Sequence, residues 1–318
     1  MQEERKFKSP YGYFSSDGKE YVITRPDTPR PWVNVICPGD YGLVVSQAGS
    51  GFSWRTNVKL NMITRWEQDL IRDDWGKYLY LRDEDSGNYW SLAWKPVCRP
   101  PESYECRHGI GYTTINSLNS EISSSLTLFV PPDEPLEIWT VKLRNNSSRR
   151  RSLSLFTYLE WRLGTVTDSH REFHRTFIET EYVEEEGALL ARKRLWELGN
   201  RQGQQWNLDW GYLAFHSSSI KPTSIVSSRE SFLGKYGSLE SPAILKRESL
   251  AATPLIKPTK SSPSKWDDPI ASLQINFQLE SYEEKTVVFT LGCAKNRKEA
   301  VSLIRKYRQV EKGAEALE

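Results

Sequence analysis

The sequence has little net charge, few cysteines and no long apolar run, and each shortage excludes a class of protein. The net charge of +2 provides no basic surface of the kind that nucleic-acid-binding proteins show. No apolar run reaches the about 18 residues that a membrane-spanning helix needs. The first residues, MQEERKFKSP, are charged and contain no apolar segment, so they are not a secretory signal. We therefore expect neither a nucleic acid nor a membrane as a partner.

The cysteines are scattered along the chain, and no two of them form a C-x-x-C pair: Cys37, Cys98, Cys106 and Cys293. Two interpretations are open, namely reduced thiols in a cytoplasmic protein and the disulfide framework of a secreted one. The irregular spacing in a long chain favours the cytoplasmic interpretation.

Sequence motifs for common cofactors and nucleophiles are also missing. The chain contains no G-x-x-x-x-G-K or G-x-G-x-x-G loop for a nucleotide, and no G-x-S-x-G elbow for a serine hydrolase. We therefore expect no cofactor.

Aromatic residues, in contrast, are abundant. The chain has 12 Trp, 15 Tyr and 11 Phe, which favour strands and provide large rigid surfaces. Many of them must lie in the core. Their number in a polar chain also suits the binding of sugars, whose C–H faces stack on aromatic rings.

Strand patterns dominate, and the clearest is SSLTLFVPPDEPLEIWTVKLRNNSSRRRSLSLFTYLEW, from Ser124 to Trp161. Apolar residues alternate in three runs separated by PPDEP and NNSSRRR, which predicts an antiparallel meander. The run from Arg149 to Arg151 is either an anion-binding patch or a solvated hairpin tip, and the tip is the simpler interpretation.

A second stretch, LRDEDSGNYW, predicts a hairpin because Asp85, Ser86, Gly87 and Asn88 suit a tight turn. Its acids, Asp83 to Asp85, match either a catalytic carboxylate pair or ordinary turn chemistry. We favour turn chemistry.

The last third of the chain contains two regions that differ from the strand pattern, a loop-rich one and a helical one. Residues 217–265 are rich in Ser, Pro and Lys and predict long surface loops around a short ordered core, FLGKYGSLESP. Asn296 and Glu299 then predict a helix start. An apolar stripe follows at helical spacing, formed by Ala300, Leu303, Ile304, Tyr307 and Val310. We expect this helix to be a connector whose apolar face needs a partner.

The densest candidate site is DSHREFHRTF, from Asp168 to Phe177. His170 and His174 have the spacing of a helical zinc pair, but Arg171 occupies the position where H-E-x-x-H has its glutamate. Arg171 and Arg175 also disfavour a cation. A site that binds a sugar or an anion through hydrogen bonds remains open, as does a purely structural loop.

A second candidate is SYECRHGIGYT, from Ser103 to Thr113. Arg107 and His108 lie between Tyr104 and Tyr112, next to glycines that permit a close turn. The stretch is either a platform for a sugar or a turn that Arg107 and His108 anchor by hydrogen bonds.

Five stretches together carry a family resemblance: YVITRPDTPRPWVN, GSGFSW, YLYLRDEDSGNYWS, YECRHGIGYT and SFLGKYGSLESP. They resemble the cellobiose and chitobiose phosphorylase family, which is glycoside hydrolase family 94, formerly glycosyltransferase 36. The family includes the phosphorylase-like part of cyclic β-1,2-glucan synthases. The five stretches occur in the family's order over nearly the whole chain.

The resemblance implies a mainly β fold, a large antiparallel β-sandwich similar to the galactose-mutarotase supersandwich, over residues 1–294. Residues 295–318 begin a helical linker. In the family an (α/α)6 barrel follows, which holds the catalytic Asp and the phosphate-binding residues and is absent from this chain. We therefore expect no catalytic residue and no metal here, with inorganic phosphate as the co-substrate of the complete enzyme.

The resemblance also implies which residues contact a sugar. A Phe-Gln-Arg segment of cellobiose phosphorylases contributes to the acceptor subsite, and Phe173, His174 and Arg175 correspond to it here. Arg175 matches, whereas His174 stands where the family example has Gln. We add Arg107 and His108 as substrate-binding candidates.

Three functions follow as hypotheses. The first is a carbohydrate-binding and structural part of an inverting phosphorylase that converts β-glucosides to α-sugar 1-phosphates. Its partners are then a catalytic (α/α)6-barrel subunit or domain, a β-linked gluco-oligosaccharide and a second copy of the chain in a homodimer. The second is an independent carbohydrate-binding protein. The third is a complete enzyme with its own site in the β domain.

Overall fold

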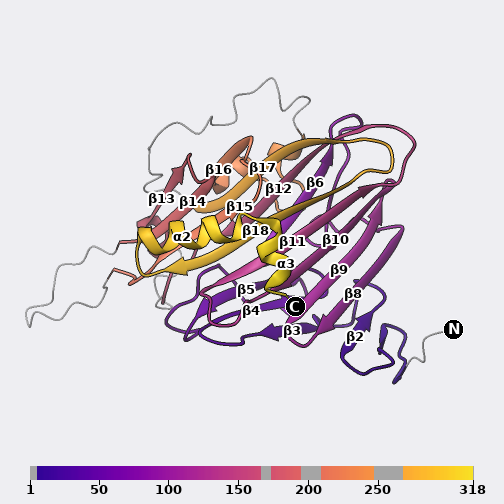
Figure 1. Ribbon diagram of the computed structural model, residues 1–318, viewed down its shortest axis with the longest axis horizontal. Helices are drawn as coiled ribbons and strands as arrows, with labels where there is room; N and C mark the ends of the chain where they lie inside the picture. The colour runs from indigo at the N-terminus through magenta and orange to yellow at the C-terminus, as the bar shows by residue number, and fades with distance from the viewer. Residues whose placement is uncertain (1–5, 166–172, 195–208, 247–267, 318) are drawn as a thin grey trace, which may run out of the picture.

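A computed structural model describes residues 6–165, 173–194, 209–246 and 268–317 and has three sheets in them, all with antiparallel pairing. The largest fills the front of Figure 1. Its ten strands are, in spatial order, β1 (Gly12–Phe14), β2 (Glu20–Ile23), β8 (Ser103–Gly109), β9 (Tyr112–Asn119), β10 (Ile122–Phe129), β11 (Leu136–Asn145), β18 (Glu284–Ala294), β15 (Leu213–Ser218), β14 (Ala188–Lys193) and β13 (Ile178–Val183).

The two smaller sheets complete the architecture. One has five strands, β16 (Ser224–Ser228), β17 (Pro269–Leu279), β12 (Arg151–Glu160), β6 (Tyr78–Asp83) and β7 (Tyr89–Ser91). The other has three, β3 (Val33–Ile36), β4 (Tyr41–Ser46) and β5 (Gly51–Arg55). Side chains from all three form one core, to which Leu43, Trp139 and Leu155 contribute fully buried side chains. The expected mainly β, antiparallel sandwich is confirmed.

Local alternation explains most strands. In β10 buried residues alternate with half-buried ones, so that Leu126 and Leu128 face the core. The predicted hairpin is confirmed: β6 pairs with β7, and Gly87 adopts φ +73° in the turn between them. Asp83 accepts hydrogen bonds from Ser86 Oγ and from the backbone N–H of Asp85, which is turn chemistry.

The predicted meander is only half correct. Strands β10 and β11 pair as expected, but β12 pairs with β6 and β17 in the five-stranded sheet. The turn after β11 therefore carries the chain across the sandwich. The Asn145 side chain holds this turn by donating to the carbonyls of Arg149 and Glu280. A residue alternation defines the faces of a strand but not the sheet that the strand joins.

Arg151 also corrects the interpretation of the arginine run as a solvated tip. Its side chain is 1% exposed, and its Nη2 lies 2.8 Å from Asp83 Oδ2. Arg149 is on the surface, as expected. The residue that begins β12 is therefore a structural ion-pair member.

The C-terminal helix begins as predicted and packs differently. In α2 (Arg297–Tyr307) the Asn296 side chain caps the helix by accepting from the Glu299 N–H. The apolar stripe from Ala300 to Tyr307 is buried against β11 and β18, so the expectation of an apolar face that needs a partner is wrong. A short helix, α3 (Val310–Glu315), follows on the same face (Figure 1).

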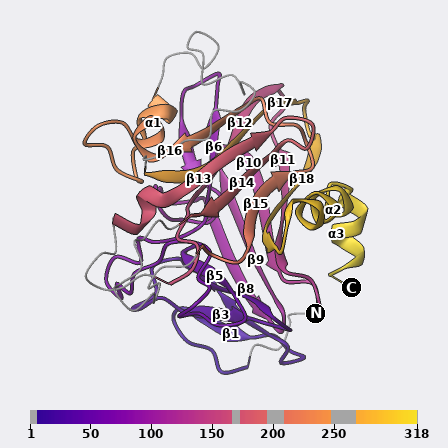
Figure 2. The same cartoon turned by 90° about the vertical axis from the view of Figure 1, so that its left-hand side faces the viewer.

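The region 217–265 is more ordered than predicted where it is described. Strand β16 lies within it, followed by α1 (Arg229–Leu233) and the 3-10 helix η3 (Ala243–Lys246). Phe232 and Leu233 pack on aromatic side chains of the five-stranded sheet. Figure 2 shows the resulting layers, with α2 and α3 on one side and α1 on the other.

The structure also bears on membrane-spanning helices, disulfides and metal sites. In the described ranges no helix is long and apolar enough to cross a membrane. The four cysteines are free thiols, and Cys106 and Cys293 are buried. Within the same ranges no group of three His, Cys, Asp or Glu side chains is placed to hold a metal.

Candidate functional site

The predicted residues His174 and Arg175 lie in the 3-10 helix η2 (Phe173–Phe177), which leads into β13. The two residues are buried, with 5% and 4% of their surface exposed. His170 and Arg171 lie outside the described residues, as does the side chain of Phe173. The expectation that these histidines hold no metal therefore stays a prediction.

Two carboxylates hold the Arg175 guanidinium. Its Nη1 lies 2.9 Å from Glu160 Oε2, and its Nη2 lies 2.6 Å from Asp268 Oδ1. Nη2 also donates to the backbone carbonyl of Pro269, at 3.2 Å. The planar fork of an arginine suits such a two-sided arrangement.

Glu160 is the centre of this group, which we call the Glu160 cluster: Glu160, Arg65, Arg175, Arg229 and Asp268. Arg65 Nη1 lies 2.9 Å from one Glu160 oxygen, and Arg229 Nε lies 3.0 Å from the other. Burial raises the pKa of Glu160, but the three arginines outweigh burial and hold that pKa below its usual value. Glu160 is therefore a buried, ionised carboxylate.

Backbone pairing brings these distant residues together. Glu160 ends β12, and its carbonyl accepts from the Arg65 N–H at 2.8 Å. Asp268 immediately precedes β17, the neighbour of β12, and its carbonyl accepts from the N–H of Arg229, the first residue of α1. The cluster forms where these chain segments meet.

The cluster extends from the interior to the surface. The Glu160 side chain is 3% exposed, whereas those of Arg229 and Asp268 are 35% and 39% exposed. Burial raises the pKa of Asp268 in spite of its arginine neighbours. The cluster contains three guanidinium groups and two carboxylates, and its two most exposed members are one of each, Arg229 and Asp268.

Arg107 and His108 lie elsewhere, on β8, and the protein itself occupies their side chains. Arg107 forms ion pairs with Glu20 and Glu105, which raise its pKa. The ring of His108 lies between two oxygens, Thr113 Oγ1 at 2.9 Å from Nδ1 and the Trp32 carbonyl at 3.0 Å from Nε2. This geometry is that of the anchored turn, and a role of either residue in sugar binding stays a prediction.

Two adjoining pockets lie beside the Glu160 cluster, and we call them together the Trp75 groove. They have volumes of about 420 and 320 Å³ and share Arg72, Asp74 and Glu240. Residues 26–31 line the first and residues 237–240 the second, together with Trp75 and Arg229. Parts of the first and last of the five resemblance stretches therefore meet here.

Trp75 connects this groove to the cluster. The Arg65 guanidinium lies over its ring, 4.0 Å from the centroid. The sequence gives no local pattern for Arg65, Arg229 or Asp268. Glu160 has a weak one, since it is an acid in the alternating strand YLEW between aromatic residues.

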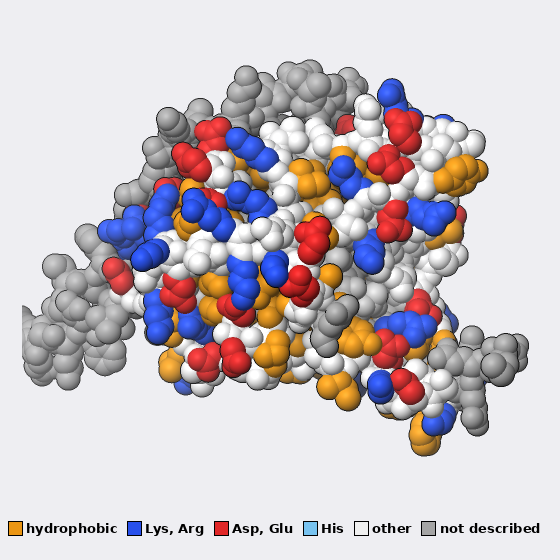
Figure 3. Space-filling view, in the orientation of Figure 1, with side chains coloured by type: hydrophobic (Ala, Val, Ile, Leu, Met, Phe, Trp, Pro, Cys, Tyr) orange, Lys and Arg blue, Asp and Glu red, His pale blue; other side chains and the backbone are white. Residues whose placement is uncertain are grey.

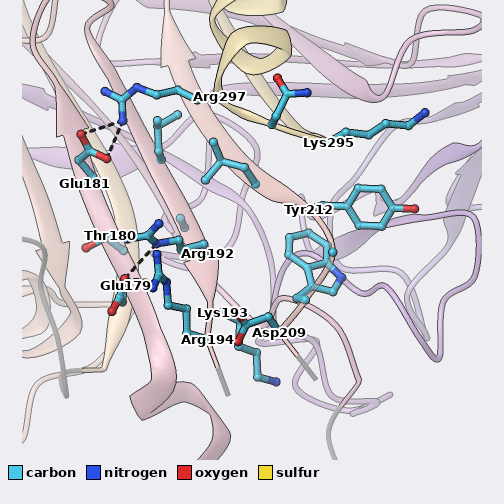
Figure 4. A pocket seen from close by; sticks show the side chains of 16 residues that line it. Glu179, Thr180, Glu181, Arg192, Lys193, Arg194, Asp209, Tyr212, Lys295 and Arg297 are labelled. Carbon is cyan, nitrogen blue, oxygen red and sulfur yellow. Dashed lines mark hydrogen bonds and ion pairs between the residues drawn. The ribbon is translucent and has the colours of Figure 1, made fainter. Parts of the chain in front are cut away.

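A further pocket, which we call the Trp210 groove, lies between β13, β14, the start of β15 and the start of α2 (Figure 4). Its volume is about 600 Å³. Figure 4 shows two ion pairs on one side, Glu181 with Arg297 and Glu179 with Arg192, and Tyr212 and Lys295 on the other.

Comparison with known proteins gives a family match over most of the chain. The family described as "Glycosyl hydrolase 94, supersandwich domain" matches residues 19–310. An N,N'-diacetylchitobiose phosphorylase of Vibrio proteolyticus is 30% identical over 91% of this chain, and a solabiose phosphorylase of Paenibacillus borealis is 28% identical over 93%. The cyclic β-(1,2)-glucan synthase NdvB of Rhizobium meliloti (strain 1021) is 28% identical over 97%.

The match covers only a part of these relatives. This chain spans 34% of the Vibrio protein, 36% of the Paenibacillus protein and 10% of the Rhizobium protein. Among solved structures, a bacterial glucoamylase complexed with acarbose aligns with 91% of this chain and 38% of its own, with a TM-score of 0.50 and 6% identity. That likeness concerns the fold alone.

Proposed function

The chain belongs to glycoside hydrolase family 94, and from that premise we propose that it is the carbohydrate-contacting and structural part of an inverting glycoside phosphorylase. The substrates of the complete enzyme are β-glucosides, which phosphate converts to α-sugar 1-phosphates. This chain corresponds to about a third of the phosphorylases that it matches, 34% of one and 36% of another. The proposal assigns catalysis to an (α/α)6 barrel in a partner domain or subunit.

One observation carries the proposal: the Glu160 cluster connects the predicted Arg175 to the Trp75 groove through shared ion pairs. A buried carboxylate that fixes several guanidinium groups holds hydrogen-bond donors in place without reorganisation, as a site for a polar ligand needs. Arg229, with 35% of its side chain exposed, is the arginine of the cluster that also lines the groove.

In this mechanism the catalytic Asp of the barrel protonates the glycosidic oxygen while phosphate attacks the anomeric carbon from the opposite face. Residues of this chain orient the acceptor sugar. Arg229 donates to sugar oxygens at the groove, and Arg175 positions it through their common partner Glu160. Direct contact of Phe173, His174 and Arg175 with the sugar stays a prediction, and so does a homodimer.

The same proposal places the chain in the cytoplasm. Four free thiols suit a reducing compartment, and a soluble disaccharide and phosphate are available there.

The alternative is an independent carbohydrate-binding protein that uses the sandwich without an enzymatic partner. The large number of aromatic residues supports this second candidate, as does the Trp75 groove, which is concave and has aromatic and charged walls.

Isothermal titration of the chain with β-linked gluco-oligosaccharides separates the two. A phosphorylase part with an incomplete subsite leaves no measurable binding at low-millimolar sugar. Binding in that range that Arg175→Ala abolishes, and that the surface variant Arg149→Ala preserves, supports the independent binder. Circular dichroism of each variant verifies that it is folded.

A further inference from the structure

The Trp210 groove contains no member of the Glu160 cluster and forms a separate site at the end of the ten-stranded sheet, beside β13, β14 and β15. We propose that it binds an acidic sugar, a pyranose that carries a carboxylate or phosphate group. The proposal is independent of the proposed function and requires no catalytic partner.

The first argument is the size and lining of the groove. Its volume of about 600 Å³ lies within the range of about 300–1,000 Å³ typical of small-molecule sites. Leu190 and Leu213 line it, together with the unsubstituted backbone of Gly211, where an added Cβ meets no atom within 4 Å. The charged side chains stand around this apolar lining (Figure 4). A ligand with an apolar face and polar edges, such as a sugar, fits this pattern.

The second argument is a fixed aromatic wall. The rings of Trp210 and Tyr212 meet edge to face, with centroids 5.4 Å apart. The protein holds both, because Trp210 Nε1 donates to Asn61 Oδ1 at 3.1 Å and the Arg55 guanidinium lies over Tyr212 at 4.5 Å from its centroid. Both residues are half-buried, so a part of each stays accessible. Rings that are held and still accessible stack on a sugar with little loss of side-chain entropy.

The third argument is charge. Among the described residues, five cations line the groove against three acids: Arg192, Lys193, Arg194, Lys295 and Arg297 against Glu179, Glu181 and Asp209. Figure 3 shows Lys and Arg side chains gathered on this part of the face, over β13–β15 and α2. The net charge of the lining is therefore +2, which attracts an anion.

Two lysines of the lining, Lys193 and Lys295, take no part in the ion pairs that hold the arginines of the groove. Glu179 pairs with Arg192 and Arg194, and Glu181 pairs with Arg297. Lys193 is 1% exposed and donates to the Thr165 carbonyl at 3.2 Å; burial, followed by repulsion from Arg162, lowers its pKa to about 8. Lys295 is exposed beside the aromatic wall and forms no ion pair with the described residues. A carboxylate or phosphate group complements the exposed ammonium group of Lys295, beside Tyr212.

Calorimetric titration of the chain with four probes tests the proposal: glucose, glucuronic acid, glucose 1-phosphate and inorganic phosphate. We expect at least one acidic sugar to bind about tenfold more tightly than glucose and than inorganic phosphate, the factor that one charge-assisted hydrogen bond supplies. Preference for glucuronic acid assigns the site to a carboxylate, and preference for glucose 1-phosphate assigns it to a phosphate. Binding should weaken as salt is raised.

Two variants locate the site. Tyr212→Leu and Lys295→Gln should each lower the affinity for the acidic sugar by about five- to tenfold. The first removes the stacking surface, and the second removes a positive charge. Lys298→Gln is the matched control, since Lys298 is an exposed lysine of the adjoining helix α2 that does not line the groove. The proposal is overturned if glucose or inorganic phosphate binds as tightly as the acidic sugars, or if none of the probes binds. It is also overturned if Lys298→Gln weakens binding as much as Lys295→Gln does.

Discussion

Two buried carboxylates of this sandwich, Glu137 and Glu160, have opposite surroundings. Glu137, on β11, has one cation, Lys77, whose Nζ lies 2.6 Å away, and both side chains are at most 3% exposed. Trp139 Nε1 donates to the same carboxylate from 2.7 Å. The site is sealed and its charges are balanced one to one.

Glu160 has three arginines instead, and two members of its cluster are more than a third exposed. The comparison separates a structural ion pair from a candidate binding site. A sealed pair satisfies its own groups, whereas an open cluster with surplus guanidinium groups holds donors that reach the surface beside a groove. The predictions below follow from this difference, and the sealed site should respond most.

Glu137→Ala should have the largest effect. It leaves the buried ammonium of Lys77 without its counter-charge, which costs about 3–5 kcal/mol of unfolding free energy. Urea unfolding measures it. The double variant Lys77→Met with Glu137→Leu is the control and should recover much of the loss, because no isolated charge remains. A single variant as stable as the parent would contradict the sealed site.

Glu160→Gln should cost less, about 2–3 kcal/mol, because water reaches part of its cluster and the amide still accepts hydrogen bonds. The arginines lower the pKa of Glu160, so its stabilising contribution is present above the normal carboxyl pKa and is lost as pH falls through the depressed value. Burial raises the pKa of Asp268, so the ionised Asp268 lowers the stability near neutral pH, and this cost disappears as pH falls. Urea unfolding at pH 7 and below pH 4 should show a smaller difference between the parent and this variant in acid. An equal difference at both pH values would refute the assignment.

His216 provides a pH test of the sealed side, because its ring lies 5.1 Å from that of Trp139. It is fully buried between the Thr290 carbonyl and Thr157 Oγ1, and burial lowers its pKa to about 4. The unfolded chain binds this proton more readily, so stability is complete above about pH 6.5 and decreases as pH falls toward 4.

The His216 contribution between pH 7 and pH 5 should be about 2 kcal/mol. Urea unfolding of the parent at both values should show this loss, and His216→Gln should reduce it. His108, whose pKa burial also lowers, accounts for a remaining slope of the same sign. An unchanged slope in the variant would rule out the buried neutral imidazole.

Arg229→Ala should have the smallest effect on stability, about 1 kcal/mol or less, since a cation a third exposed is screened by water and salt. Urea unfolding at low and high salt measures it. A loss as large as that of Glu160→Gln would mean that the open cluster is as structural as the sealed one.

The sequence predicts the elements of the fold better than their assembly. Alternation identifies β10, β11 and β12, and Asn296 identifies the start of α2. Alternation could not place β12 in the other sheet, because that choice depends on partners distant in sequence. The burial of the α2 stripe depends on β11 and β18 in the same way.

The candidate site follows the same rule. Arg175 has a motif around it, and the sequence points to it directly. Arg65, Glu160, Arg229 and Asp268 come from four separate segments that meet only through strand pairing and backbone hydrogen bonds. Residues that form a site by long-range contacts leave little local pattern in the sequence, as the weak signal of Glu160 shows.

The central proposal, that this chain is the carbohydrate-contacting part of a phosphorylase whose catalysis lies in another domain or subunit, can be tested by an assay for sugar 1-phosphate release. The purified chain is incubated with phosphate and β-linked glucose or N-acetylglucosamine disaccharides, and the Vibrio proteolyticus chitobiose phosphorylase serves as the positive control. We predict release by the control and none by the chain alone. Release that increases with the concentration of the chain would contradict the account and would place a catalytic site within the sandwich.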